Sequence, residues 1–267
     1  PGTRRSVDGI VTSGDWDGAH LAEGAVELPG GDVYRGPLLG ARAGADDEAP
    51  LAEAYRSWLR DRSEAGNAHA SFVLAVAHFE GRVPEPNAER ARSLLRRAAD
   101  GDVISAQIER ARHLLDEGVT GEGILLLRRA AGADDPRAHL LLGTYAQTGQ
   151  HVPRDHQAAR EHYRAAARSG DVTAQNNLAW LLATSPEADV RDGDTAVEIM
   201  LPLVHFTSDW GHYDTLAAAY AELGAFDAAL EWQTRALEDA GGNVPEPILR
   251  QMRERLALYR RGRPWRE

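Results

Sequence analysis

The sequence has no cysteine, no lysine and no long apolar stretch. Without cysteine the chain forms neither a disulfide framework nor a thiol nucleophile. Because no run of about 18 apolar residues is present, the sequence predicts no transmembrane helix. Its start does not resemble a signal peptide. The chain begins at Pro1 rather than at methionine, from which we expect that it has been processed or trimmed. We predict a cytoplasmic location.

All 30 basic residues are arginine, and alanine is abundant. This bias is typical of a GC-rich coding genome, so we expect a bacterial source. The net charge is −11, which argues against a nucleic-acid partner because such proteins present a basic surface. The end of the chain is basic within this acidic whole. This basic segment either caps the repeats with a solvated face or binds an acidic partner. We favour the solvated capping face.

Few residues are arranged for catalysis or metal binding. None of the 10 histidines lies in a histidine–glutamate–x–x–histidine pattern, and no serine lies in a nucleophile elbow. His205, Asp209 and His212 are candidate ligands for a metal ion, but the aromatic residues around them favour packing between repeats. The glycine-rich stretch 118–123 lacks the lysine of a phosphate loop. We therefore predict no enzyme activity, no metal and no cofactor.

A short sequence motif recurs at the spacing of a helical hairpin. Residues 94–99 and 126–131 both read LLRRAA, and residues 162–167 read HYRAAA. The paired alanines are 32 and then 36 residues apart, close to the helix–turn–helix repeat of about 34 residues. A repeat of this period stacks on its neighbours because it cannot bury its apolar face alone. The predicted fold is mainly α, an α-solenoid of helix–turn–helix repeats.

A second register supports the same period. In four segments a small residue follows an alanine by five positions, which lets a neighbouring helix come close; the pairs are Ala70 and Ala75, Ala106 and Ala111, Ala138 and Gly143, Ala174 and Ala179. Glycine is predicted to end first helices and aspartate to cap second helices, at Gly81, Gly149, Gly224, Asp155 and Asp194. Pro245 and Pro247 predict the start of a last helix, 248–259.

These patterns resemble two repeat families. Residues 142–170, with LG, VPRD, HYR and AA in order, resemble a Sel1-like repeat, and residues 68–101 show the same pattern. Residues 104–134 fit it more loosely. Residues 216–237, with LAAAY before Gly224 and AL at the end, resemble a tetratricopeptide repeat, and residues 172–205 begin like one. The Sel1 resemblance places His162 at an aromatic packing position.

The first 46 residues have turn signals and little helical periodicity, so they predict short strands and hairpins. Residues 24–36 resemble a MORN repeat, a β-hairpin unit, with Val26 and Leu28 on one face, a turn at Gly30–Gly31 and Tyr34 packed across it. Residues 16–18, Gly40 and Gly44 resemble parts of adjoining units. The predicted organisation is a MORN-like β segment at 1–46, a linker or capping helix at 47–67, Sel1-like repeats at 68–171, tetratricopeptide-like repeats at 172–242 and a capping helix with a basic tail at 243–267.

The resemblance implies a binding protein. In tetratricopeptide repeats the first helices of the hairpins line a concave groove, and the register carries over to Arg112, Thr144, Gln147, Asn176, Asn177, Trp180 and Asp214. Asn177 takes the position at which such proteins bind a peptide backbone or a terminal carboxylate. Arg112 could form an ion pair with a carboxylate of the partner. Trp180 either offers the partner a large apolar contact or packs between repeats.

We therefore predict a non-catalytic scaffold or adaptor that binds a protein or peptide partner, as in a multi-protein complex. The alternative is a regulatory or targeting part of a larger enzyme whose catalytic domain lies upstream of Pro1 or in another chain.

Overall fold

A computed structural model describes residues 2–14, 23–39, 50–206, 209–242 and 244–267. The chain divides into two compact units, Pro1–Ala133 and Asp134–Glu267. The described residues form four strands and twelve helices, so the expected mainly α, helical-repeat fold class with a short N-terminal β segment is confirmed. In the described part of the chain, no helix is both long and apolar enough to span a membrane.

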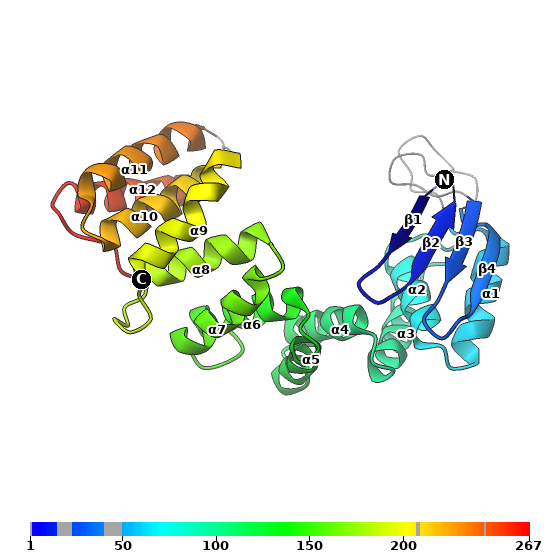
Figure 1. Ribbon diagram of the computed structural model, residues 1–267. Coiled ribbons are helices and arrows are strands. Elements are labelled where there is room, and N and C mark those ends of the chain that lie inside the picture. Colours follow the sequence, from blue (N-terminus) through cyan, green and yellow to red (C-terminus); the bar gives the residue numbers. More distant parts are fainter. Residues whose placement is uncertain (1, 15–22, 40–49, 207–208, 243) are drawn as a thin grey trace. The chain divides into compact units, whose positions relative to one another are not determined.

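The four strands form one antiparallel sheet in chain order (Figure 1), with β1 at Gly2–Arg5, β2 at Val11–Gly14, β3 at Glu23–Glu27 and β4 at Val33–Pro37. The β3–β4 hairpin is the one expected from the sequence. Val26 lies opposite Tyr34, Val26 and Leu28 are buried, and both turn glycines have a positive φ. The assignment of this hairpin to a MORN repeat stays a prediction. The residues that resemble parts of the adjoining MORN units, 16–18, Gly40 and Gly44, lie outside the described residues.

The sheet is attached to the first helices by aromatic and polar contacts. Tyr34 on β4 packs against Tyr55 and Trp58 of α1 (Glu53–Glu64), with ring centroids 5.0 and 5.6 Å away. Asp8, in the β1–β2 turn, accepts a hydrogen bond of 2.9 Å from the Ser105 N–H. That amide lies in the first turn of α4, whose N-cap Val103 has no side-chain acceptor, so the turn supplies the missing cap.

The helices of the first unit pair as antiparallel hairpins, α2 (Ala68–Phe79) with α3 (Ala88–Asp100) and α4 (Ile104–Asp116) with α5 (Thr120–Gly132). Asn67 and Asn87 cap α2 and α3 with their side-chain oxygens. The hairpins are closely packed at small residues: a Cβ added at Gly101 would lie 2.4 Å from the Cβ of Ala68. Alanine and glycine therefore set how near these helices can come.

The second unit contains seven described helices: α6 (Pro136–Thr148), α7 (His156–Ala167), α8 (Val172–Thr184), α9 (Gly193–Phe206), α10 (Trp210–Glu222), α11 (Phe226–Ala240) and α12 (Glu246–Tyr259). Gly149 ends α6 in the left-handed conformation, as expected, and Asp155 caps α7. The cap of α9 differs from expectation. Asp192 accepts from the Thr195 N–H at 3.0 Å, whereas Asp194 lies inside the first turn.

One packing assignment from the sequence was wrong. Tyr163, not His162, is the buried aromatic of α7, and it lies against Gly143, where an added Cβ would be 2.6 Å from its ring. His162 is half-buried, and its Nδ1 lies 3.0 Å from Nδ1 of His139. The two residues are adjacent in sequence, and the repeat pattern alone does not decide which of them turns inward.

Candidate partner-binding face

An extended segment follows α12 and lies on the first helices of the second unit. Residues 263–267 have no helix or strand of their own, and the red end of the chain meets α8 in Figure 1. The Glu267 N–H donates to the Thr184 carbonyl at 3.0 Å, and the Arg266 guanidinium donates to the Ala183 carbonyl at 3.3 Å. Both carbonyls belong to the last turn of α8, where they have no partner within the helix. The segment therefore completes the end of α8.

The side chain of Glu267 accepts hydrogen bonds from two different helices. Trp180 Nε1 of α8 lies 2.8 Å from one carboxylate oxygen, and Gln147 Nε2 of α6 lies 2.9 Å from the other. The Gln147 amide is oriented by Tyr163, whose hydroxyl donates to its oxygen at 2.7 Å. A tyrosine hydroxyl is protonated at neutral pH, and burial raises the pKa of Tyr163 further, so this hydroxyl is a donor. We call Gln147, Trp180, Thr184 and Glu222 the first-helix face.

Arg266 forms an ion pair with Glu222 at the end of α10. The same carboxylate accepts from Arg191 Nε at 2.8 Å, so a second arginine also holds it in place. The Glu222 side chain is only 16% exposed, which strengthens an ion pair compared with one in open solvent. The first-helix face thus offers donors to an acidic residue and an acceptor to a basic one.

Arg255 of α12 lies beneath this face and connects it to the core. Its guanidinium lies 5.3 Å from the ring of Trp180 and 5.8 Å from that of Trp265, distances at which a cation is attracted to an aromatic ring. It also donates two hydrogen bonds to Asp214, at 3.0 and 2.8 Å, and Gln233 donates a third at 2.6 Å. Burial raises the pKa of the Asp214 carboxyl, and the contacts with Arg255 and Gln233 oppose this rise.

The seven residues expected to bind a partner are not all in one place. Gln147 and Trp180 meet on the Glu267 carboxylate, and Thr144 is joined to them because its hydroxyl lies 3.3 Å from that of Tyr163. Asp214 is 5% exposed and bound to Arg255, so the structure corrects its placement: it supports the face from below and does not line it. Arg112 belongs to the first unit, where it is paired with Glu109 at 3.2 Å.

Asn176 and Asn177 lie one turn before Trp180 on α8. The side-chain oxygen of Asn176 is buried without a hydrogen-bond partner among the described residues, and Asn177 is half-buried. Residues three and four apart share one side of a helix, so both residues lie on the side of α8 that carries Trp180, with the Asn176 oxygen turned inward.

Sequence reasoning missed Arg255, Glu222 and the 263–267 segment itself. Glu222 and Arg255 look like ordinary charged residues on amphipathic helices. One signal was available: Trp265 stands among arginines at a basic end of the chain, and a large apolar side chain there indicates a docked segment rather than a solvated one.

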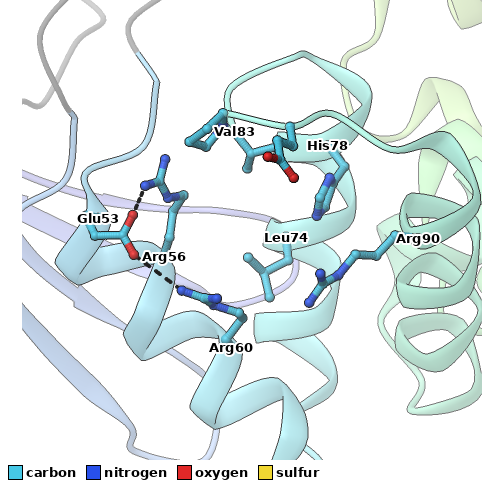
Figure 2. Close-up of a pocket in the computed structure, with 9 residues that line it drawn as sticks. Glu53, Arg56, Arg60, Leu74, His78, Val83 and Arg90 are labelled. Atoms are coloured by element: carbon cyan, nitrogen blue, oxygen red, sulfur yellow. Dashed lines mark hydrogen bonds and ion pairs between the residues drawn. The ribbon is translucent and has the colours of Figure 1, made fainter.

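The first unit holds a cavity of about 240 Å³ beside α1, α2 and the start of α3, shown in Figure 2. Glu53 binds both Arg56 and Arg60, while His78 and Arg90 face the cavity from the other side (Figure 2).

The charges around this cavity affect one another. Burial and the nearby Arg60 lower the pKa of Arg56. Burial and Arg90 lower the pKa of His78, whose Nδ1 accepts from the Asn87 N–H at 3.3 Å. Glu53 and Glu85 offset most of the positive charge, so this cavity is a weaker candidate than the first-helix face.

Two of the three candidate metal ligands, Asp209 and His205, have other contacts in the structure. Asp209 caps α10, accepting from the Gly211 N–H at 2.8 Å, and His205 Nδ1 lies 2.5 Å from the Leu201 carbonyl. Within the described ranges, no three histidine, aspartate or glutamate side chains are grouped as metal ligands would be.

Comparison with known proteins identifies the repeats. Residues 68–103 and 136–171 match the Sel1 repeat family model, which confirms both Sel1-like segments expected from the sequence. The structure of a Sel1 repeat protein from Oxalobacter formigenes aligns with a TM-score of 0.56 at 20% identity, covering 70% of this chain and 80% of that one. No curated protein sequence matches this chain.

A second structure is similar to the same degree. It is c5321, a protective antigen present in uropathogenic Escherichia coli strains and displaying an SLR fold, with a TM-score of 0.53 and 20% identity over 69% of this chain and 41% of that chain. These likenesses establish the fold. The chain contains Sel1 repeats, and repeat proteins of this kind generally bind protein partners through extended surfaces.

Proposed function

We propose that this chain is a non-catalytic scaffold or adaptor that binds an extended segment of a partner protein on the first-helix face. One observation carries the proposal: an extended segment of the chain itself, residues 263–267, lies on that face. Its contacts use both the main chain and the side chains, as peptide recognition requires. The face therefore has the shape and the hydrogen-bonding groups that an extended peptide needs.

The chemistry of the face suits peptide binding better than catalysis. Its polar groups are an amide, an indole and a carboxylate, in Gln147, Trp180 and Glu222. None of these is paired with a general base or a nucleophile in the manner of a catalytic site. Trp180 belongs to the residue type most enriched among side chains that dominate binding energy.

A peptide-library selection against the full chain tests this function. We expect enriched peptides to bind the wild-type chain and to lose at least about tenfold in affinity on the Trp180→Ala variant, since a central aromatic contact contributes about 2 kcal/mol or more. Arg250→Ala, an exposed change on α12, is the matched control and should leave binding unchanged. Circular dichroism of each variant checks that it remains helical. Enriched peptides that bind Trp180→Ala as tightly as wild type would move the binding site away from this face.

A further inference from the structure

We infer that the first-helix face selects a segment in which an arginine is followed directly by an acidic residue, and that residues 263–267 are a built-in competitor for such a partner. This inference rests on the proposed function and adds to it the chemistry of the partner. It starts from the two side chains that the structure shows bound, Arg266 and Glu267.

The acidic position is defined by two donors that converge on one carboxylate. Trp180 Nε1 and Gln147 Nε2 each donate to a different oxygen, at 2.8 and 2.9 Å. A carboxylate accepts at both oxygens, whereas a carboxamide has one acceptor and one NH₂ group that would face a donor. Glutamate should therefore bind better than glutamine here, although the two side chains have nearly the same shape.

Both donors are fixed before a ligand arrives. The Tyr163 hydroxyl holds the Gln147 oxygen, so the Gln147 NH₂ group points towards the ligand. The Trp180 ring lies against the Arg255 guanidinium, and Arg255 is itself held by Asp214. Donors that need not be ordered on binding lose less conformational entropy, so this small site can discriminate between ligands.

The basic position is defined by Glu222 and by the end of α8. The Arg266 guanidinium is paired with Glu222 and also donates to the Ala183 carbonyl. These acceptors lie on different helices, and the planar fork of arginine can reach both at once. Lysine would bring one charge to one point and would lose the second contact.

The order of the two residues follows from the main chain. The Glu267 N–H is fixed to the Thr184 carbonyl, and neighbouring side chains of an extended chain point to opposite sides. One side chain therefore reaches Glu222 on α10 while the next reaches Gln147 on α6. Reversing the order of the arginine and the acidic residue would place each charge beside the wrong partner.

The test uses a fluorescein-labelled peptide with the sequence of residues 260–267 and an amidated end, so that only the glutamate side chain supplies a carboxylate. Fluorescence anisotropy measures its binding to the wild-type chain, residues 1–267, and to an Arg266→Ala/Glu267→Ala chain, whose own segment is loosened. A tethered segment acts at an effective concentration of about millimolar. We expect the peptide to bind the loosened chain at least about tenfold more tightly than wild type.

A second peptide, with glutamine in place of the glutamate, tests the acidic position. We expect it to bind the loosened chain about tenfold more weakly, because it loses hydrogen bonds to a charged group. In a loosened chain that also carries Trp180→Phe, which keeps the ring and removes the N–H donor, this difference should shrink to about threefold or less. A structural effect of Trp180→Phe would weaken both peptides equally and would leave their ratio unchanged.

Three results would overturn the inference. Equal binding to the wild-type and loosened chains would show that the 263–267 segment does not compete. Equal binding of the two peptides would remove the acidic preference, while peptides from the library selection could still support the proposed function. A wild-type dimer in sedimentation that becomes a monomer in the loosened chain would show that the segment serves a second copy.

Discussion

Arg255 and Asp214 form a two-point ion pair inside the second unit, with Nε 3.0 Å from Oδ1 and Nη2 2.8 Å from Oδ2. Asp214 is 5% exposed and Arg255 is 4% exposed. The pair joins α10 to α12 across 41 residues of sequence. Because the same guanidinium lies against Trp180 and Trp265, this core contact also fixes the first-helix face.

Removing one partner of this pair should strongly destabilise the second unit. We expect Asp214→Ala to lower the free energy of unfolding by about 3–5 kcal/mol, because it leaves Arg255 buried without its counter-charge. The triple change Asp214→Leu/Gln233→Leu/Arg255→Met should recover most of that loss, since an apolar replacement removes the whole buried polar group. Urea unfolding followed by circular dichroism measures both. A triple variant as unstable as the single one would contradict this account.

The close approach of α6 and α7 gives a second prediction. An alanine at Gly143 would place its Cβ 2.6 Å from the Tyr163 ring, so Gly143→Ala should cost about 1–3 kcal/mol of stability. Gly132 at the end of α5 is the matched control, because a Cβ there has no neighbour within 4 Å. Gly132→Ala should leave stability unchanged or raise it by up to about 1 kcal/mol. Thermal unfolding measures the change in melting temperature of each variant relative to wild type. Equal changes for Gly143→Ala and Gly132→Ala would contradict the packing argument.

Tyr34 allows the polar and aromatic links between the sheet and α1 to be separated. Its hydroxyl donates to the Pro37 carbonyl at 3.0 Å, and its ring packs on Tyr55 and Trp58. We expect Tyr34→Phe to cost about 0.5–1.5 kcal/mol and Tyr34→Ala to cost about 3–5 kcal/mol. Near-ultraviolet circular dichroism during urea unfolding reports the aromatic cluster. If Phe and Ala cost the same, the ring contacts would contribute nothing.

The lowered pKa of His78 predicts a pH dependence of stability. Burial and Arg90 disfavour the charged form in the folded chain, so the unfolded chain binds more protons once the pH falls below about 6.5. Stability should therefore be lost as the pH falls from the unfolded pKa through the lower folded pKa. The asparagine oxygen of His78→Asn can still accept from the Asn87 N–H. This variant should therefore lose less stability on acidification than the wild-type chain, by the part that His78 contributes. Urea unfolding between pH 7.5 and 5 compares the two chains, and parallel profiles would contradict the prediction.

The repeats could be predicted from the sequence because they depend on local rules. Alanine at fixed helix positions, Gly149 in a left-handed cap and Asp155 at a helix start each act within a few residues, and the structure shows all three. The expected last helix, 248–259, is also present and begins two residues earlier, at Glu246. Periodicity does not determine which of His162 and Tyr163 turns inward, because that depends on the space left by Gly143 on a different helix.

The face itself was only partly predictable for the same reason. Gln147 and Trp180 followed from their register on first helices, but their common contact, Glu267, is 120 residues from Gln147 and 87 from Trp180. Asp214 was expected to line the groove from its register on a first helix. Its burial depends on Arg255, 41 residues further along the chain, and no local pattern links the two.

The position of Arg255 has a consequence for how this chain can evolve. A change at Arg255 or Asp214 should alter the stability of the core and the proposed binding face together, because one guanidinium contacts both Asp214 and the two indoles. Changes at Arg266 or Glu267 should alter the segment and its contacts with α8 and Glu222, but not the buried ion pair. On the proposed function, drift in partner choice should therefore proceed through residues 263–267 and through Gln147, while the ion pair underneath persists in descendants that have exchanged one partner for another.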